Sequence, residues 1–256
     1  MKSNRSINVA LASYLMLLVI AEIIIAYYAE LGLDSPYLGI AIHVILILIL
    51  LSYSFFPGRE CSVYMPILLI PPLMRILSTS LIGFQFIHTI IIINSLLILT
   101  AYLFIKNNKI PLKDIGISTG NVKLQLFIGA TGILLGYTEY IILGEQIIGE
   151  VIFPTFIAYS FALFLFTGFS EELVFRGIIL TNLKSVIGRN YALVFVSLVF
   201  TVMHIIWKNP LDILFVFFVA LFYGYVFLKT KSLLGISMSH GLANIMLFLV
   251  IPLYLH

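Results

Sequence analysis

Long runs of apolar residues, each broken by a few polar ones, fill most of the chain. A transmembrane helix needs about 20 mainly apolar residues. We expect membrane-spanning helices at nine places, near residues 7–28, 37–56, 64–83, 84–105, 122–143, 154–175, 190–206, 211–228 and 233–254. The third run is the weakest, because Pro71, Pro72 and Arg75 lie inside it. The pattern therefore predicts eight or nine spans.

The same pattern argues against β-structure. The runs are too long for strands and lack the strict alternation of a membrane barrel, and an open sheet edge cannot lie in lipid. The sixth run continues as a predicted helix to about residue 187. No repeat, soluble domain or low-complexity tract is visible. We therefore predict an all-α polytopic transmembrane helix bundle that forms one membrane-embedded domain over residues 1–256.

Composition agrees with the membrane interpretation. Of 256 residues, 62% are hydrophobic and only 10% are charged. Ordinary soluble domains carry about 25% charged and 45–50% apolar residues. A soluble fold of this length could not cover so much apolar surface, whereas a lipid environment removes the need to do so.

The distribution of charge predicts an orientation, because Lys and Arg mark the cytoplasmic side of membrane proteins. Basic residues gather at the N-terminus and in three connections: Lys2, Arg5, Lys106, Lys109, Lys113, Lys123, Lys184, Arg189, Lys229 and Lys231. Acidic residues gather in two others: Glu30, Asp34, Glu145 and Glu150. Nine spans with a cytoplasmic N-terminus separate the two groups. We expect an integral multi-pass protein of the cell membrane, and the net charge of +3 does not indicate a nucleic-acid partner.

Polar residues at membrane depth are the candidates for chemistry, because a charge placed there costs a few kcal/mol or more unless it has a partner. Glu22, His43, His88 and Glu139 stand singly in their runs. We expect these four to be packed, hydrogen-bonded interior residues rather than catalysts. Arg75, close to two prolines, is expected to mark a helix break or the end of a span.

The second half of the chain carries polar residues in helical pairs. Glu172 and Arg176 are four residues apart, on one helix face and in the favourable order. Glu172 is therefore expected to neutralise Arg176. Glu171 points about 100° away around the helix and has no partner within the motif. An unpaired carboxylate in apolar surroundings suits a general base, so Glu171 is the better candidate for catalysis.

Two further pairs have the same spacing. His204 follows Phe200 by four residues, and Asn244 follows His240 by four. A His and an Asn on one face are hydrogen-bond donors of the kind that stabilise an oxyanion. Together with a carboxylate base and a second His, they could support the attack of water on an amide.

These motifs resemble those of a known family. E-E-L-V-F-R at 171–176, F-T-V-M-H at 200–204 and H-G-L-A-N at 240–244 are similar to the three motifs of the CPBP family. That family comprises CAAX prenyl proteases of the Rce1 type and bacteriocin-processing enzymes, also called Abi proteins. The resemblance covers roughly residues 109–250, a protease core, whereas the N-terminal helices of residues 1–105 carry no matching motif.

The resemblance implies an intramembrane endopeptidase with its active site in the helices of the C-terminal half. It assigns water activation to Glu171 and His204, and the oxyanion hole to His240 and Asn244. It implies three supporting residues: Glu172, Arg176 and Phe200. The expected partners are membrane lipid and a membrane-associated or lipidated peptide or protein. In prenyl-processing members the substrate is a C-terminal CAAX tail whose lipid reaches the site through the bilayer.

Three alternatives stay open. Family members are widely labelled metalloproteases, and Glu171, His204 and His240 could form a zinc set. We favour a mechanism without metal or cofactor, because no H-E-x-x-H helix is present and Glu172 is expected to be engaged by Arg176. A catalytically inactive scaffold of the same fold would be expected to lack a catalytic residue, and none is missing. A transporter using the Glu and His residues as a proton relay often shows repeated halves, and none is visible.

Overall fold

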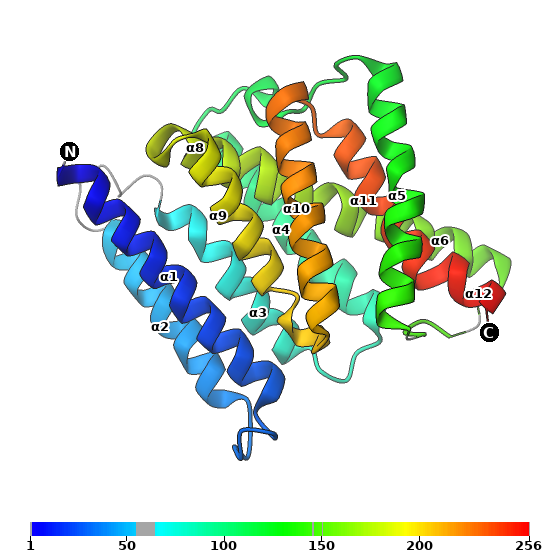
Figure 1. Cartoon of the computed structure of the whole chain (residues 1–256), viewed down its shortest axis with the longest axis horizontal. Coiled ribbons are helices and arrows are strands. Elements are labelled where there is room, and N and C mark those ends of the chain that lie inside the picture. The colour runs from blue at the N-terminus through cyan, green and yellow to red at the C-terminus, as the bar shows by residue number, and fades with distance from the viewer. Residues whose placement is uncertain (1, 55–64, 145, 150, 256) are drawn as a thin grey trace. The chain divides into compact units, whose positions relative to one another are not determined.

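The predicted all-helical class is confirmed by the computed structural model, which describes residues 2–54, 65–144, 146–149 and 151–255. These residues form helices joined by short connections, and no β-strand is found among them (Figure 1). Glu145 and Glu150, two of the acidic residues used to predict the orientation, lie outside the described residues.

Seven of the described helices are long and apolar enough to cross a membrane: Ile7–Tyr27, Phe86–Asn107, Val122–Leu143, Phe153–Ile187, Arg189–Trp207, Pro210–Thr230 and Leu234–Tyr254. Two shorter apolar helices, Tyr37–Tyr53 and Met65–Ser80, occupy the places of the second and third predicted spans. Within the described residues each predicted apolar run contains a helix, and the chain is an integral membrane protein.

The chain divides into two compact units. The first comprises Met1–Ile82 and Asn182–Leu221, and the second comprises Gly83–Thr181 and Phe222–His256. The division falls within α10 (Pro210–Thr230), which contributes its beginning to the first unit and its end to the second. The prediction of a single membrane-embedded domain stays a prediction.

The first unit is built on a helical hairpin at the N-terminus. Besides α10, its helices are α1 (Lys2–Tyr27), α2 (Tyr37–Ser54), η2 (Met65–Leu69), α3 (Ile70–Ser80), α8 (Thr181–Ile187), α9 (Arg189–Val202) and η6 (Ile205–Trp207). Helices α1 and α2 lie side by side (Figure 1), and α1 also packs on α9 and η6. A Cβ on Gly39 of α2 would lie 2.7 Å from the carbonyl oxygen of Ala21. Only glycine therefore allows this close approach of the two helices.

The single polar residues differ in their surroundings. Glu22 and His43 are fully buried and face each other, which confirms the prediction that they are packed interior residues. Arg75 is also buried, inside α3 rather than at its end. His88 is exposed, so the prediction that it is an interior residue is wrong. It lies in the first turn of α4 (Phe86–Asn107), where the chain has only just entered the helix.

The second unit contains most of the long helical run Phe153–Ile187. Its helices besides α10 are α4, η3 (Leu112–Ile115), α5 (Val122–Leu143), α6 (Phe153–Leu163), η4 (Phe164–Phe169), α7 (Ser170–Glu172), η5 (Leu173–Leu180), α11 (Leu234–Ile245), η7 (Met246–Val250) and α12 (Ile251–Leu255). The run from α6 to η5 is continuous, and η4 and η5 are π-helical. Such segments are rare and frequently occur at functional sites.

Helix α11 is fixed by backbone packing on two sides. It lies beside α5 (Figure 1), where a Cβ on Gly132 would overlap the carbonyl oxygen of Ser239. It also packs on η4, where a Cβ on Gly168 would lie 2.6 Å from the backbone nitrogen of Gly241. Small residues allow such close packing between membrane helices. The helix that carries His240 therefore has little freedom to shift.

Candidate active site

Two adjacent carboxylates occupy the short α-helical turn α7, between the two π-helical segments. The side chain of Glu172 is fully buried, whereas that of Glu171 is 17% exposed. Successive residues of a helix point in different directions, so the two carboxylates meet different surroundings. The predicted division between a working Glu171 and a supporting Glu172 stays a prediction.

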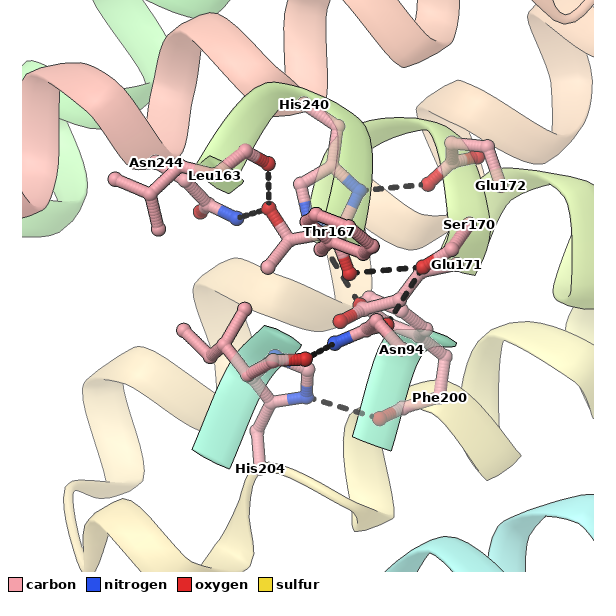
Figure 2. A network of polar contacts seen from close by, with 12 residues as sticks. Asn94, Leu163, Thr167, Ser170, Glu171, Glu172, Phe200, His204, His240 and Asn244 are labelled. Carbon is pink, nitrogen blue, oxygen red and sulfur yellow. Dashed lines mark hydrogen bonds and ion pairs between the residues drawn. The ribbon is translucent and has the colours of Figure 1, made fainter. Parts of the chain in front are cut away.

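Glu172 has two partners at one oxygen. Arg176 Nη1 donates a hydrogen bond to Glu172 Oε1 at 2.8 Å, which confirms the pair expected from the four-residue spacing. The same oxygen lies 2.9 Å from Nδ1 of His240 on α11 (Figure 2). The sequence predicted the first contact and not the second, because 68 residues separate Glu172 from His240.

His240 lies between the two carboxylates. An ionised carboxylate only accepts hydrogen bonds, so Nδ1 is the donor toward Glu172. The other ring nitrogen, Nε2, lies 3.9 Å from Oε2 of Glu171. That separation is too long for a direct hydrogen bond. A separation of this length can be bridged by one small group that hydrogen-bonds to both atoms.

Tyr223, in the second half of α10, packs against the His240 ring. Its ring stacks on His240 with the centroids 5.9 Å apart, and the guanidinium of Arg176 lies 5.7 Å from the Tyr223 centroid. The Tyr223 hydroxyl bonds to Ser239 Oγ at 3.0 Å, and Ser239 Oγ lies 2.8 Å from Thr131 Oγ1 of α5. Nothing in the sequence distinguished Tyr223 from the other aromatic residues of this apolar run.

Asn244 is oriented by a threonine that the sequence reasoning missed. Its Nδ2 donates to Thr167 Oγ1 at 2.7 Å, and the Thr167 hydroxyl donates to the carbonyl of Leu163 (Figure 2). Thr167 precedes Glu171 by four residues. That spacing, used to find the other pairs, could have placed Thr167 on the same helix face as the catalytic candidate.

A second missed pair fixes the helix beside Glu171. Ser170 Oγ donates to Asn94 Oδ1 at 2.6 Å, and Asn94 Nδ2 donates to the carbonyl of Ile90 at 3.0 Å (Figure 2). Ser170 and Asn94 are both buried. Because Ser170 is the residue before Glu171, this contact between α7 and α4 helps to hold the carboxylate in place.

His204 belongs to the first unit, where it follows the end of α9. Its Nδ1 lies 3.0 Å from the carbonyl oxygen of Phe200, and the two rings lie 4.8 Å apart. A carbonyl only accepts hydrogen bonds, so Nδ1 carries the hydrogen and the neutral ring has its lone pair on Nε2. The pairing of Phe200 with His204 agrees with their spacing. Glu171 lies in the second unit, so a role shared with His204 stays a prediction.

In a comparison with known families, residues 153–246 match the family described as type II CAAX prenyl endopeptidase Rce1-like. The chain carries a CPBP-family domain. The matched segment contains every predicted site residue: Glu171, Glu172, Arg176, Phe200, His204, His240 and Asn244. No curated protein and no solved structure matches the chain. At the level of the family, the domain is that of an intramembrane peptidase.

Glu171, His204 and His240 are the three residues considered as a possible zinc set. Among the described residues, no group of three His, Cys, Asp or Glu side chains is arranged to hold a metal ion. His240 Nδ1 contacts Glu172, so His240 could offer only Nε2 to a metal. Glu172 itself receives both Arg176 and His240 at Oε1.

Proposed function

We propose that the CPBP domain hydrolyses a peptide bond of a membrane-associated or lipidated peptide or protein, with Glu171 as general base. The observation that supports this most is the position of His240 Nε2, 3.9 Å from Glu171 Oε2, on a ring whose other nitrogen is held by Glu172. A base and a hydrogen-bonding group thus lie close together on two span-length helices. A water molecule there can contact both.

In the proposed reaction, Glu171 takes a proton from this water, and the water oxygen attacks the carbonyl carbon of the scissile bond. The carbonyl π electrons move to the oxygen and form an oxyanion. As the oxyanion collapses, the C–N bond breaks and the proton held by Glu171 passes to the leaving nitrogen. Glu171 is favoured over Glu172 because Glu172 is fully buried and already accepts two donors. As the family resemblance implies, His204 assists in activating the water.

His240 and Asn244 are proposed to stabilise the oxyanion. His240 already donates from Nδ1 to Glu172, so donation from Nε2 requires the doubly protonated ring, whose charge Glu171 and Glu172 offset. The amide of Asn244 has two N–H groups. One donates to Thr167, and the other is proposed to donate to the oxyanion. Donors of this type act best when they are fixed before the reaction.

The substrate class follows from where the site lies. Glu171 belongs to the helix Phe153–Ile187 and His240 to Leu234–Tyr254, both long and apolar enough to span a membrane. A peptide bond must therefore be brought to the bilayer, as a lipid anchor would do. We propose a lipidated C-terminal tail of the CAAX type as the first substrate to test. We also propose the cell membrane as the location, with a cytoplasmic N-terminus.

Protein reconstituted in nanodiscs is expected to cleave a fluorogenic peptide with a prenylated CAAX end faster than the same peptide without the lipid. Mass spectrometry of the products identifies the bond. The rate should survive treatment with a strong chelator, because Glu171 is proposed to act as the base itself and not as a metal ligand. Loss of cleavage on chelation and its recovery with zinc would contradict the metal-independent mechanism. Equal cleavage rates on the two peptides would contradict the proposed substrate class, and no cleavage of either would contradict the proposed function.

Thr167→Val is expected to lower kcat about tenfold. Valine keeps the shape of threonine but removes the oxygen that receives Asn244 Nδ2 at 2.7 Å. A half-buried donor left without its acceptor costs about 1–3 kcal/mol, and about 1.4 kcal/mol is tenfold in rate. Thr167→Ser, which keeps the hydroxyl, is the matched control and should stay near the wild-type rate. Equal kcat values for the two variants would exclude the positioning of Asn244 by Thr167.

A further inference from the structure

Three buried polar side chains meet in the first unit, one from each of three helices. Glu22 of α1 and His43 of α2 are fully buried, and Arg75 of α3 is 7% exposed. Arg75 Nε lies 2.9 Å and 2.7 Å from the two carboxylate oxygens of Glu22. His43 Nε2 lies 3.3 Å from Glu22 Oε1. Burying such charges costs several kcal/mol per ion before their attraction is counted. We therefore expect this cluster to have a role besides packing.

Arg75 also bonds to the backbone on the other side of its guanidinium. Its Nη2 donates to the carbonyl oxygen of Met203 at 2.6 Å. Met203 is the residue between Val202, the last residue of α9, and His204. A guanidinium is planar and holds its N–H groups in a fixed fork. Because Glu22 fixes Nε, it also fixes the direction in which Nη2 meets Met203.

The segment that Arg75 contacts carries His204. The His204 backbone nitrogen donates to the carbonyl of Thr201 at 2.9 Å, and Trp207 donates back to the His204 carbonyl at 3.1 Å. The chain leaves α9 here and enters η6. The last carbonyls of a helix lack partners within it and carry a partial negative charge. The guanidinium of Arg75 therefore caps α9 next to the histidine.

We infer that Arg75, oriented by Glu22, is a positioning residue for His204. By holding the Met203 carbonyl it fixes the end of α9, and with it the backbone from which the His204 imidazole extends. His43 completes the cluster, with its Nε2 3.3 Å from Glu22 Oε1. The inference rests on the proposed function, in which His204 assists the attack of water. It gives the N-terminal helices, which lie outside the matched segment, a part in the reaction.

The test uses Trp207, the single tryptophan of the chain, as a reporter three residues after His204. Arg75→Met removes the bond to Met203, and Arg189→Met, at the exposed start of the same helix α9, is the matched control. Because Arg75→Met leaves Glu22 buried without its cation, Glu22→Gln/Arg75→Met is made as well. The double variant removes both charges, which is far less costly than stranding one. It still lacks the donor to Met203.

Both variants are expected to raise the acrylamide quenching of Trp207 at least about twofold. They are expected to lower kcat about 10- to 100-fold with KM nearly unchanged, since small displacements at a site can cost that much. Quenching and kcat equal to those of Arg189→Met would overturn the inference, and so would altered quenching with unaltered kcat. A wild type that cleaves no reporter would overturn the proposed function instead. The quenching comparison would then still decide whether Arg75 holds the turn.

Discussion

Glu171→Gln is expected to cleave the reporter peptide about 10²–10⁴ times more slowly than the wild type, the usual loss for a general base. Glutamine has the same shape but cannot take the proton from water. The Glu171 side chain is 17% exposed and lies 3.9 Å from His240, without the direct hydrogen bonds that hold Glu172. The change should therefore affect kcat strongly and the thermal midpoint little. Single-turnover rates in nanodiscs, with unfolding followed in detergent, measure both.

Glu30→Gln makes the same chemical change on an exposed carboxylate, which bonds to Lys208 at 2.8 Å in the first unit. It should leave the cleavage rate at the wild-type value. If Glu171→Gln behaved like this control, Glu171 would not be the base and the assignment of the active site would be lost. A loss of rate accompanied by an equal loss of folded protein would also count against a purely catalytic role.

Contacts between residues close in the sequence could be predicted because a helix fixes them. The pairs Glu172–Arg176 and Phe200–His204 follow from a spacing of four residues, and both are present in the structure. The helical class could also be predicted, because over apolar runs of such length only a helix pairs all backbone N–H and C=O groups in lipid. The residues bearing the three motifs lie in the segment that matches the family.

Contacts between helices could not be predicted from the sequence, because they depend on how the helices pack and not on a local pattern. Glu172 meets His240 across 68 residues, and Asn244 meets Thr167 across 77. Both contacts depend on the close approach of α11 to η4, which the glycines at 168 and 241 allow. Arg75 illustrates the same limit: beside Pro71 and Pro72 it resembled a helix break, yet it bonds to Glu22, 53 residues earlier. The sequence shows that these residues are polar, but it does not predict which residues they contact.

Glu172→Gln is expected to impair both stability and turnover, and for different reasons. The four-residue spacing alone predicts a loss of stability at least as large as the loss of turnover, because Arg176 would lose its partner. Arg176 is 1% exposed, and breaking a buried ion pair costs about 3–5 kcal/mol, which corresponds to a thermal midpoint lower by roughly 10 °C. The structure adds the bond from His240 Nδ1 to the same carboxylate. Without that charge the doubly protonated His240 loses a counter-ion, so kcat should fall even for the folded protein.

Glu172→Gln/Arg176→Met separates the two effects. Removing both charges relieves the stranded arginine, so the thermal midpoint should recover most of the way toward that of the wild type. The cleavage rate of the folded fraction should not recover, because His240 still lacks the carboxylate on Nδ1. Unfolding in detergent and kcat per folded molecule distinguish the outcomes. An unchanged midpoint in the single variant would contradict the ion pair. Full activity in the double variant would instead show that Glu172 serves only Arg176, and that His240 is positioned by its other contacts, the Tyr223 ring first among them.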